Sequence, residues 1–198
     1  MSRELFTIGH SNHSIETFIG LLKQHEIDAV ADVRSHPYSR YLPHFNKSEL
    51  QAALKNAGIR YVFLGRELGA RPDKPDCYDT AGKAVYEKIA ATPEFAAGID
   101  RLLKGSQTYK ITLVCAEKDP IVCHRTILVC HDLRDLGFKI SHILPDGSLE
   151  SHEDLEQRLL ESHGLHQLSL FDTRSLEERL LDAYQRQGGK IAYILPEK

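Results

Sequence analysis

The sequence predicts an α/β protein with a Rossmann-like three-layer domain, a mostly parallel sheet and a C-terminal tail. Short apolar runs alternate with segments in which apolar residues recur at helical spacing, as in folds whose helices cover both faces of a parallel sheet. Four of the short runs end at polar or ionisable residues, which is typical of strand ends at the mouth of such a sheet. We therefore assign residues 1–160 to the domain and residues 161–198 to the tail.

The predicted strands are short apolar runs bounded by turn residues. The first strand ends at Gly9, and the fourth runs into the polar segment that starts after Cys115. The predicted strands cover residues 4–9, 28–35, 60–65, 110–117 and 139–145.

The predicted helices between these strands combine helical spacing with recognisable start and stop residues. Ser14 caps the first helix and Gly58 closes the second. Pro93 breaks or divides the third, and the fourth runs from Thr126, as the cap, to Gly137. The predicted helices cover residues 14–27, 46–59, 81–107 and 125–137.

The tail is predicted to contain two helices and a strand. Gly164 ends the first helix, at residues 151–164, and Asp172, Thr173 or Ser175 caps the second, at residues 175–189. Residues 189–198 have the composition of a strand, and whether residues 189–195 complete the sheet stays open.

Composition and charge exclude several classes of protein. The 198 residues carry 25 Lys and Arg against 28 Asp and Glu, so no global basic field attracts nucleic acid or an anionic membrane. Four cysteines are few for a disulfide scaffold, the first residues contain no apolar signal region, and no apolar run approaches membrane-spanning length. We expect a soluble, cytoplasmic protein with reduced thiols and no membrane partner.

Arginine and histidine are concentrated at the predicted strand ends and in the loops that follow them. Because the carboxyl ends of parallel strands meet at one edge of the sheet, these residues predict a shared pocket for an anionic, phosphate-bearing substrate. The candidate phosphate-binding residues are Arg34, Arg40, Arg125, Ser11 and Ser39.

The segment CAEKDPIVCHR, residues 115–125, is the strongest candidate for chemistry. A nucleophilic thiol needs a depressed pKa, which a helix start and the neighbouring His124 and Arg125 supply to Cys123. The spacing does not fit the loop of cysteine phosphatases, in which five residues separate the cysteine from the arginine. The alternative is that Cys115 and Cys123 are small buried residues.

Two other kinds of chemistry remain open in the same region. Asp32 and Glu117 follow separate strands and are candidates for nucleophile or general base, although Asp32 could instead pair with Arg34. Cys115, Cys123 and His124 are also ligand types for zinc. We expect no cofactor, because adjacent Cys and His rarely face one ion and no C-x-x-C pair is present.

Four motifs together resemble the widespread prokaryotic family of domains of unknown function numbered 488: TIGHSNHSIETF, ADVRSHPYSRYLPHFNKSEL, FLGRELGARP and CAEKDPIVCHR. The chain departs from the family pattern at Ala70, where a second glycine is usual. The resemblance implies a Rossmann-like fold and a polar pocket without naming the reaction. The positions that match the family motifs are His10, Ser11, Asp32, Arg34, Pro37, Ser39, Arg40, Cys115, Glu117, Cys123, His124 and Arg125.

A pentapeptide in the tail resembles the Q-L-S/D-L-F peptide by which bacterial replication and repair proteins bind the DNA sliding clamp. Two large apolar side chains could fill a pocket while the glutamine amide anchors the backbone. The alternative is an apolar staple before the following helix. The residues are Gln167, Leu168, Ser169, Leu170 and Phe171.

These observations favour an enzyme of DNA repair or nucleotide metabolism that is recruited to the clamp and cleaves or transfers a glycosidic or phosphoester bond. Glu117 or Asp32 would act as nucleophile or base, and His10 or His124 as acid. One alternative is a thiol-dependent transferase or redox enzyme that uses Cys115 or Cys123. The other is a non-catalytic module that binds a nucleotide or nucleic acid.

Overall fold

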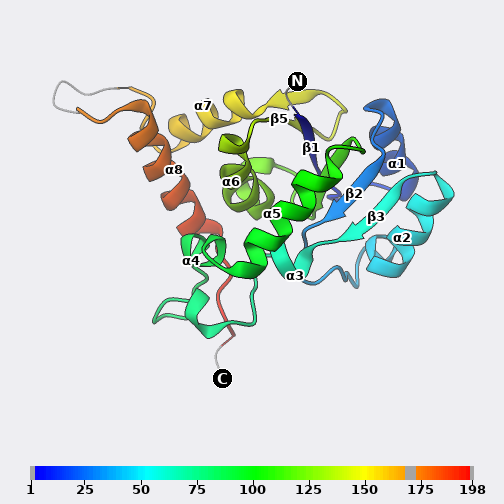
Figure 1. The fold of residues 1–198 in the computed structure, drawn as a ribbon, viewed down its shortest axis with the longest axis horizontal. Helices are drawn as coiled ribbons and strands as arrows, with labels where there is room; N and C mark the ends of the chain where they lie inside the picture. Colours follow the sequence, from blue (N-terminus) through cyan, green and yellow to red (C-terminus); the bar gives the residue numbers. More distant parts are fainter. Residues whose placement is uncertain (1–2, 168–172, 197–198) are drawn as a thin grey trace.

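A six-stranded sheet with the order β3-β2-β4-β1-β5-β6 forms the centre of the molecule (Figure 1). The computed structural model describes residues 3–167 and 173–196. Strands β1 to β5 are parallel to their neighbours and β6 pairs antiparallel with β5, which confirms the predicted α/β class with a mostly parallel sheet. The strands are β1 (Arg3–Gly9), β2 (Ala29–Asp32), β3 (Arg60–Phe63), β4 (Ile111–Cys115), β5 (Phe138–Ile143) and β6 (Leu149–Ser151).

Helices cover both faces of the sheet, because alternate strand residues send apolar side chains to opposite sides. Phe6 and Ile8 of β1 pack with α1 (Ile15–Gln24) and α2 (Lys47–Asn56) in one core. Leu5 belongs to the core on the other face. That face is covered by α3 (Gly65–Leu68), α4 (Tyr86–Ala90), α5 (Pro93–Gly105), the π-helical turn η4 (Arg125–Cys130), α6 (His131–Leu133), α7 (His152–Ser162) and α8 (Leu176–Ile191).

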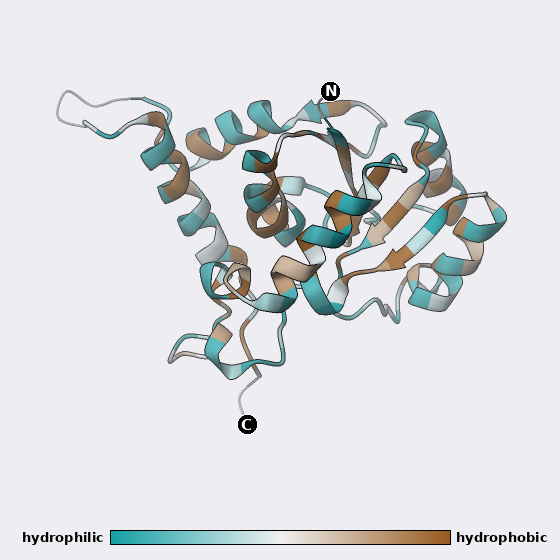
Figure 2. Cartoon of the chain, in the orientation of Figure 1, coloured by the Kyte–Doolittle hydropathy of each residue, from teal (hydrophilic) through white to brown (hydrophobic). Residues whose placement is uncertain are grey.

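Helix starts follow from local hydrogen bonding. The Ser14 side chain accepts the backbone N–H of Thr17 at the start of α1, as predicted. Pro93 begins α5 and separates it from α4, so the predicted helix at residues 81–107 is two helices. Figure 2 shows the result: hydrophobic residues lie along the strands, and they alternate with hydrophilic residues along α5 and α8.

The helix predicted at residues 125–137 differs in its first turns. It begins as the π-helical turn η4, in which Thr126 is buried inside the turn rather than capping it. The chain continues through α6 and a single 3-10 turn, Arg134–Leu136, and ends at Gly137 with a φ of 77°, as expected. π-helical turns are rare and are found disproportionately at functional sites.

The two C-terminal helices pack on the same core as the sheet. Ser175 caps α8 and shares a capping box with Glu178. The helix continues to Ile191, beyond the predicted start of a strand, and Ile194 forms an isolated bridge with Lys83 instead of joining the sheet. Gln167 is exposed, whereas residues 168–171 of the clamp-like peptide lie outside the described residues.

No helix in the described part of the chain is both long enough and apolar enough to span a bilayer.

Candidate functional site

The strand order identifies the carboxyl end of β4 as the position at which a ligand crevice is expected. β4 lies between β1 and β2, whose chains continue into α1 and α2 on one face of the sheet. The chain leaves β4 toward η4 on the opposite face. Neighbouring strands whose connections diverge in this way leave space for a ligand beyond their carboxyl ends.

Two cysteines and one carboxylate meet in this crevice. Cys115 is the last residue of β4, and Cys123 follows a short 3-10 turn, Pro120–Val122. The Sγ atoms of Cys115 and Cys123 each lie 3.0 Å from the same Oε2 atom of Glu117. Both cysteines are buried, whereas Glu117 is exposed, so the carboxylate connects a buried pair of thiols to the surface.

His124 faces the thiols with one ring nitrogen and the backbone with the other. Its Nε2 lies 3.0 Å from the Val33 carbonyl, which can only accept, so Nε2 carries the proton. Its Nδ1 lies 3.6 Å from Cys115 Sγ and is left as an acceptor. Burial disfavours the charged ring, yet the neighbouring Cys123 sulfur raises the pKa of His124. His124 is therefore placed to take a thiol proton.

Arg125 supplies a buried positive charge that acts on the two thiols. Its side chain is fully buried, and Nη1 donates to the Glu117 carbonyl at 2.8 Å. Among the described residues, Nη2 has no hydrogen-bond partner. Burial alone would raise the pKa of Cys123, but hydrogen bonding with Cys115 and the charge of Arg125 hold that pKa well below its usual value.

The pKa of Cys115 shifts in the opposite direction. Burial raises it first, and the neighbouring Cys123 and Glu117 raise it further. The two thiol pKa values therefore move apart, a difference that burial alone could not produce because both cysteines are buried.

Because Gly9 has no side chain, the end of β1 can lie against the backbone of Glu117. A Cβ atom at position 9 would lie 1.9 Å from the Glu117 carbonyl oxygen, the same oxygen that accepts from Arg125. The backbone N–H of His10 then donates to the Cys115 carbonyl at 2.8 Å. The close approach fixes the loop that carries Glu117.

His10 lies beside the crevice on the α1 side. Its ring stacks on Phe45 with 4.3 Å between centroids, and Nδ1 lies 2.9 Å from the Ser11 carbonyl. Burial, and next the charge of Arg34, lower the pKa of His10 to about 4, so it is neutral at pH 7. A neutral imidazole is a poor general acid, the role that the sequence favoured for it.

Asp32 and Arg34 form a buried ion pair. Arg34 Nε and Nη2 donate to the two oxygens of Asp32 at 2.9 and 2.6 Å. Tyr61 donates to Asp32 Oδ2 at 2.8 Å, and Arg34 Nη1 donates to the Phe45 carbonyl at 2.9 Å. Both residues are buried, so this pair matches the structural alternative considered for Asp32.

The other candidate phosphate-binding residues make local contacts. Arg40 is exposed and donates to the Tyr41 hydroxyl at 2.8 Å. Ser39 Oγ accepts from the Leu42 backbone at 3.0 Å, and Ser11 Oγ donates to Asn12 at 3.2 Å. These contacts hold loops in place and do not bring the three side chains to the thiols.

The sulfur atoms of Cys115 and Cys123 and Nδ1 of His124 all lie within 4.8 Å of one another. The adjacent Cys123 and His124 thus converge on one point, which their spacing in the sequence did not lead us to expect. The same atoms have the types and approximate separation of a zinc ligand set. Metal content therefore has to be measured alongside thiol chemistry.

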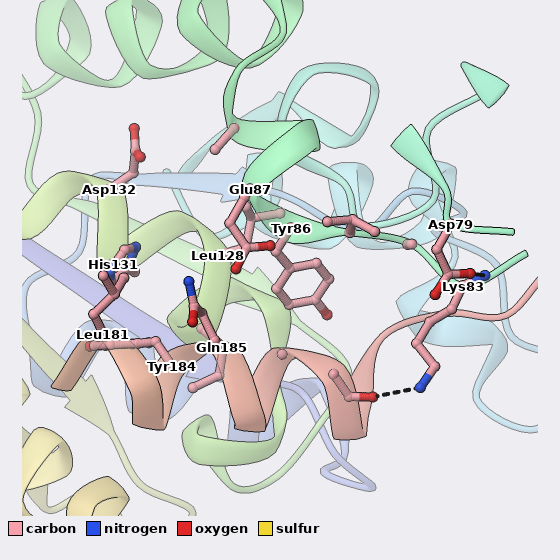
Figure 3. Close-up of a pocket in the computed structure, with 16 residues that line it drawn as sticks. Asp79, Lys83, Tyr86, Glu87, Leu128, His131, Asp132, Leu181, Tyr184 and Gln185 are labelled. Carbon is pink, nitrogen blue, oxygen red and sulfur yellow. Dashed lines mark hydrogen bonds between the residues drawn. The ribbon is translucent and has the colours of Figure 1, made fainter. Parts of the chain in front are cut away.

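A cavity of about 450 Å³ lies beside the site, between α4, η4, α6 and α8 (Figure 3). Tyr86 points into this cavity, and its ring packs against Gly188 of α8. Burial raises the pKa of Tyr86, and so do the nearby Cys123 and Cys115. Tyr86 is therefore the cavity residue whose pKa responds to the charge of the thiols. His131 and Tyr184 line the wall formed by α6 and α8, with 4.3 Å between their ring centroids.

Sequence reasoning missed Thr7, His142 and Tyr86, which lie near or connect to the site. Thr7 and His142 are fully buried polar residues in the middle of β1 and β5. The available signal was a polar side chain interrupting an apolar strand, because such a group must find a buried partner.

A family model described as domain of unknown function DUF488 matches residues 14–131. The chain belongs to the DUF488 family. The matched segment contains the whole Cys115-to-Arg125 region and ends at the start of α6, so β5 and helices α7 and α8 lie beyond it. No curated protein and no solved structure matches the chain.

Proposed function

We propose that this DUF488 protein is a thiol-dependent redox enzyme that exchanges its Cys115–Cys123 dithiol with the disulfide of a small molecule. The observation that carries the proposal is the shared contact of both sulfurs with Glu117 Oε2, at 3.0 Å each. One low and one high thiol pKa at short range is the arrangement that a nucleophilic and a resolving cysteine require.

In the first step, the Cys123 thiolate attacks one sulfur of the substrate disulfide, whose S–S bond breaks. The other substrate sulfur leaves as a thiolate and takes the proton that His124 received from Cys123. In the second step, Cys115 gives its proton to Glu117 and attacks Cys123 Sγ. The remaining substrate sulfur leaves with that proton, so one disulfide is reduced to two thiols while the enzyme dithiol becomes a disulfide.

The geometry supports thiol chemistry better than phosphoester or glycosidic bond cleavage. Asp32 is buried and its oxygens are occupied by Arg34 and Tyr61, so it is not presented to a substrate. Arg34 binds Asp32 and Phe45, and Arg125 is fully buried, so neither guanidinium is presented to a phosphate. Glu117 is the carboxylate that remains open to solvent, and it contacts thiols.

The experiment is alkylation of each cysteine by iodoacetamide across pH, followed by mass spectrometry. We expect Cys123 to react at a pH well below the usual thiol range, while Cys130, which is fully buried with a raised pKa, serves as the internal control. Oxidised glutathione should convert the pair to an intramolecular disulfide in the wild type but not in C115S. Alkylation of Cys123 only at ordinary thiol pH, or zinc that protects both cysteines until a chelator is added, would overturn the proposal.

We further propose that residues 167–171 recruit the protein to a bacterial sliding clamp, which would bring its thiol chemistry to DNA. The support is the match at all five positions, together with the exposure of Gln167 after α7. Clamp recruitment would offset the weak attraction of a chain with net charge −3 for DNA.

Calorimetric titration with the clamp tests recruitment. We expect micromolar binding that is lost when Leu170 and Phe171 are both changed to Ala. His166→Ala is the matched control, because His166 is exposed and lies outside the pentapeptide. Absence of binding by the wild type would remove the clamp from the proposal and leave the thiol chemistry to be judged alone.

A further inference from the structure

A continuous line of buried polar side chains connects Arg125 with the C-terminal helices. It begins on η4, crosses β1 and β5, and ends on α7 and α8. Most of its members are almost completely buried, and such groups are costly unless each finds a partner. The members are Arg125, Thr7, His142, His152, Tyr184 and Glu156.

The inner half of the line depends on strand register. Thr7 and His142 are direct partners across the parallel β1 and β5 strands, which places their side chains on the same face of the sheet. Arg125 Nε donates to Thr7 Oγ1 at 3.3 Å, and Thr7 Oγ1 lies 2.8 Å from His142 Nδ1.

The outer half passes through the C-terminal helices. His142 Nε2 lies 3.1 Å from Nδ1 of His152, the first residue of α7. His152 Nε2 lies 3.1 Å from the hydroxyl of Tyr184 on α8, and that hydroxyl donates to Glu156 Oε1 at 3.0 Å. Arg134 Nη1, at 3.1 Å, holds the Glu156 carboxylate in place.

The two ends dictate the direction of every hydrogen bond. A guanidinium can only donate, and an ionised carboxylate can only accept. Burial lowers the pKa of His142 well below its usual value and that of His152 to about 4, so both rings are neutral at pH 7. Each neutral ring has one donor and one acceptor, so Nε2 carries the proton in both, and Thr7 donates to His142.

We propose that Thr7, His142, His152 and Tyr184 are positioning residues that hold Arg125 on the Glu117 carbonyl, so that the C-terminal helices help to fix the loop that carries Glu117 beside the two thiols. This inference rests on the proposed thiol function. It assigns a role to α7 and α8, which lie outside the segment matched by the DUF488 model. The role acts through Arg125 and involves no contact with the substrate.

Thr7→Val and Thr7→Ser form the decisive pair of variants. Valine keeps the shape of threonine but removes the acceptor of Arg125 Nε, whereas serine keeps the hydroxyl. We expect Thr7→Val to slow oxidation of the Cys115–Cys123 pair by oxidised glutathione about tenfold at pH 7, because the loop that carries Glu117 loses its fixed position, and Thr7→Ser to restore the wild-type rate. Tyr184→Phe, which breaks the line at its far end, should produce a smaller decrease in the same direction.

A second measurement separates failure of this inference from failure of the proposed function. Long-range ¹H–¹⁵N NMR spectra report which ring nitrogen of His142 and His152 carries the proton. We expect protonated Nε2 in both rings of the wild-type protein and a changed state of His142 in Thr7→Val. Other tautomers in the wild type would overturn the inference whatever the thiols do.

Two further outcomes distinguish the proposed function from the role of the buried polar line. An unperturbed Cys123 pKa with the expected tautomers would overturn the proposed function, and the inference with it, since no reactive thiol would be left to position. Thr7→Val that is folded and destabilised but whose Cys115–Cys123 pair is oxidised at the wild-type rate would show that the line only stabilises the fold, which would overturn the inference while leaving the thiol chemistry intact.

Discussion

Two neighbouring strand ends in this protein each present a carboxylate to the same crevice, but with opposite chemical consequences. At the end of β2, Asp32 is buried and accepts two hydrogen bonds from the Arg34 side chain. At the carboxyl end of β4, Glu117 is exposed and contacts the sulfurs of Cys115 and Cys123. The first carboxylate meets a fixed positive charge, and the second meets two groups that can lose protons.

The contrast between Asp32 and Glu117 shows that the partner of a carboxylate at a strand end decides which chemistry is open to it. Both oxygens of the buried Asp32 carboxylate already accept hydrogen bonds from a guanidinium, and one of them also accepts from a phenol. A carboxylate on two thiols can receive one of their protons and release it to solvent. Asp32 is therefore held by its partners, while Glu117 contacts both thiols and stays exposed to solvent.

The largest effect that separates the two carboxylates should appear in stability. Asp32→Asn leaves Arg34 buried without its counter-charge, and we expect a loss of about 3–5 kcal/mol in the free energy of unfolding. Glu117→Gln should cost less than about 1 kcal/mol, because Glu117 is exposed, but should slow reduction of oxidised glutathione. Urea denaturation and a turnover assay on both variants test this expectation. A large loss of stability in Glu117→Gln, with slow turnover only in Asp32→Asn, would contradict it.

Gly9→Ala tests how tightly the Glu117 loop is fixed against β1. The added Cβ would lie 1.9 Å from the Glu117 carbonyl, so the backbone must shift, and we expect a loss of about 3 kcal/mol together with slower alkylation of Cys123. Gly20→Ala is the matched control, because nothing lies within 4 Å of a Cβ at this exposed position in α1. The control should gain about 0.5–1 kcal/mol. Equal melting temperatures for the two variants would contradict the close approach.

Acid should destabilise both sides of the sheet through buried neutral histidines. The folded-state pKa values of His10 and His152 are each about 4, below the ordinary value of 6.5, so the unfolded chain binds more protons between these limits. Stability is therefore complete above pH 6.5 and falls as the pH drops toward 4, by about 2 kcal/mol per group at pH 5.

Urea denaturation at pH 7.5 and pH 5 measures this loss, and a substitution separates the two sides. His10→Gln should flatten the dependence in part, because the α7–α8 side keeps His152. A wild-type protein equally stable at both pH values would contradict the neutral state of these rings.

Much of the fold was predictable because the apolar patterns of the strands and helices are local. The main errors lie where tertiary contacts override local signals. Gly188 and Gly189 indicated the end of a helix, yet α8 continues to Ile191, and Gly188 gives the ring of Tyr86 room to pack. The short strand β6 was missed, because three residues carry too little pattern.

The candidate site was predictable in membership but not in pairing. One segment, residues 115–125, contains both cysteines, Glu117, His124 and Arg125, so the sequence alone indicated them as one group. Which carboxylate meets which partner depends on side-chain geometry that spacing does not contain. Thr7 and His142 are 135 residues apart, and only the register of β1 with β5 brings them into contact.

The smallest effect is expected at Arg40, which the sequence assigned to phosphate. Arg40 is exposed and bonded to its neighbour Tyr41, so Arg40→Ala should change the free energy of unfolding by less than about 0.5 kcal/mol and leave the alkylation of Cys123 unchanged. Calorimetric titration with a nucleoside triphosphate tests whether Arg40 binds phosphate. If the wild type binds the nucleotide and Arg40→Ala does not, then phosphate recognition belongs to the loop after β2, and the protein binds a charged ligand as well as a disulfide.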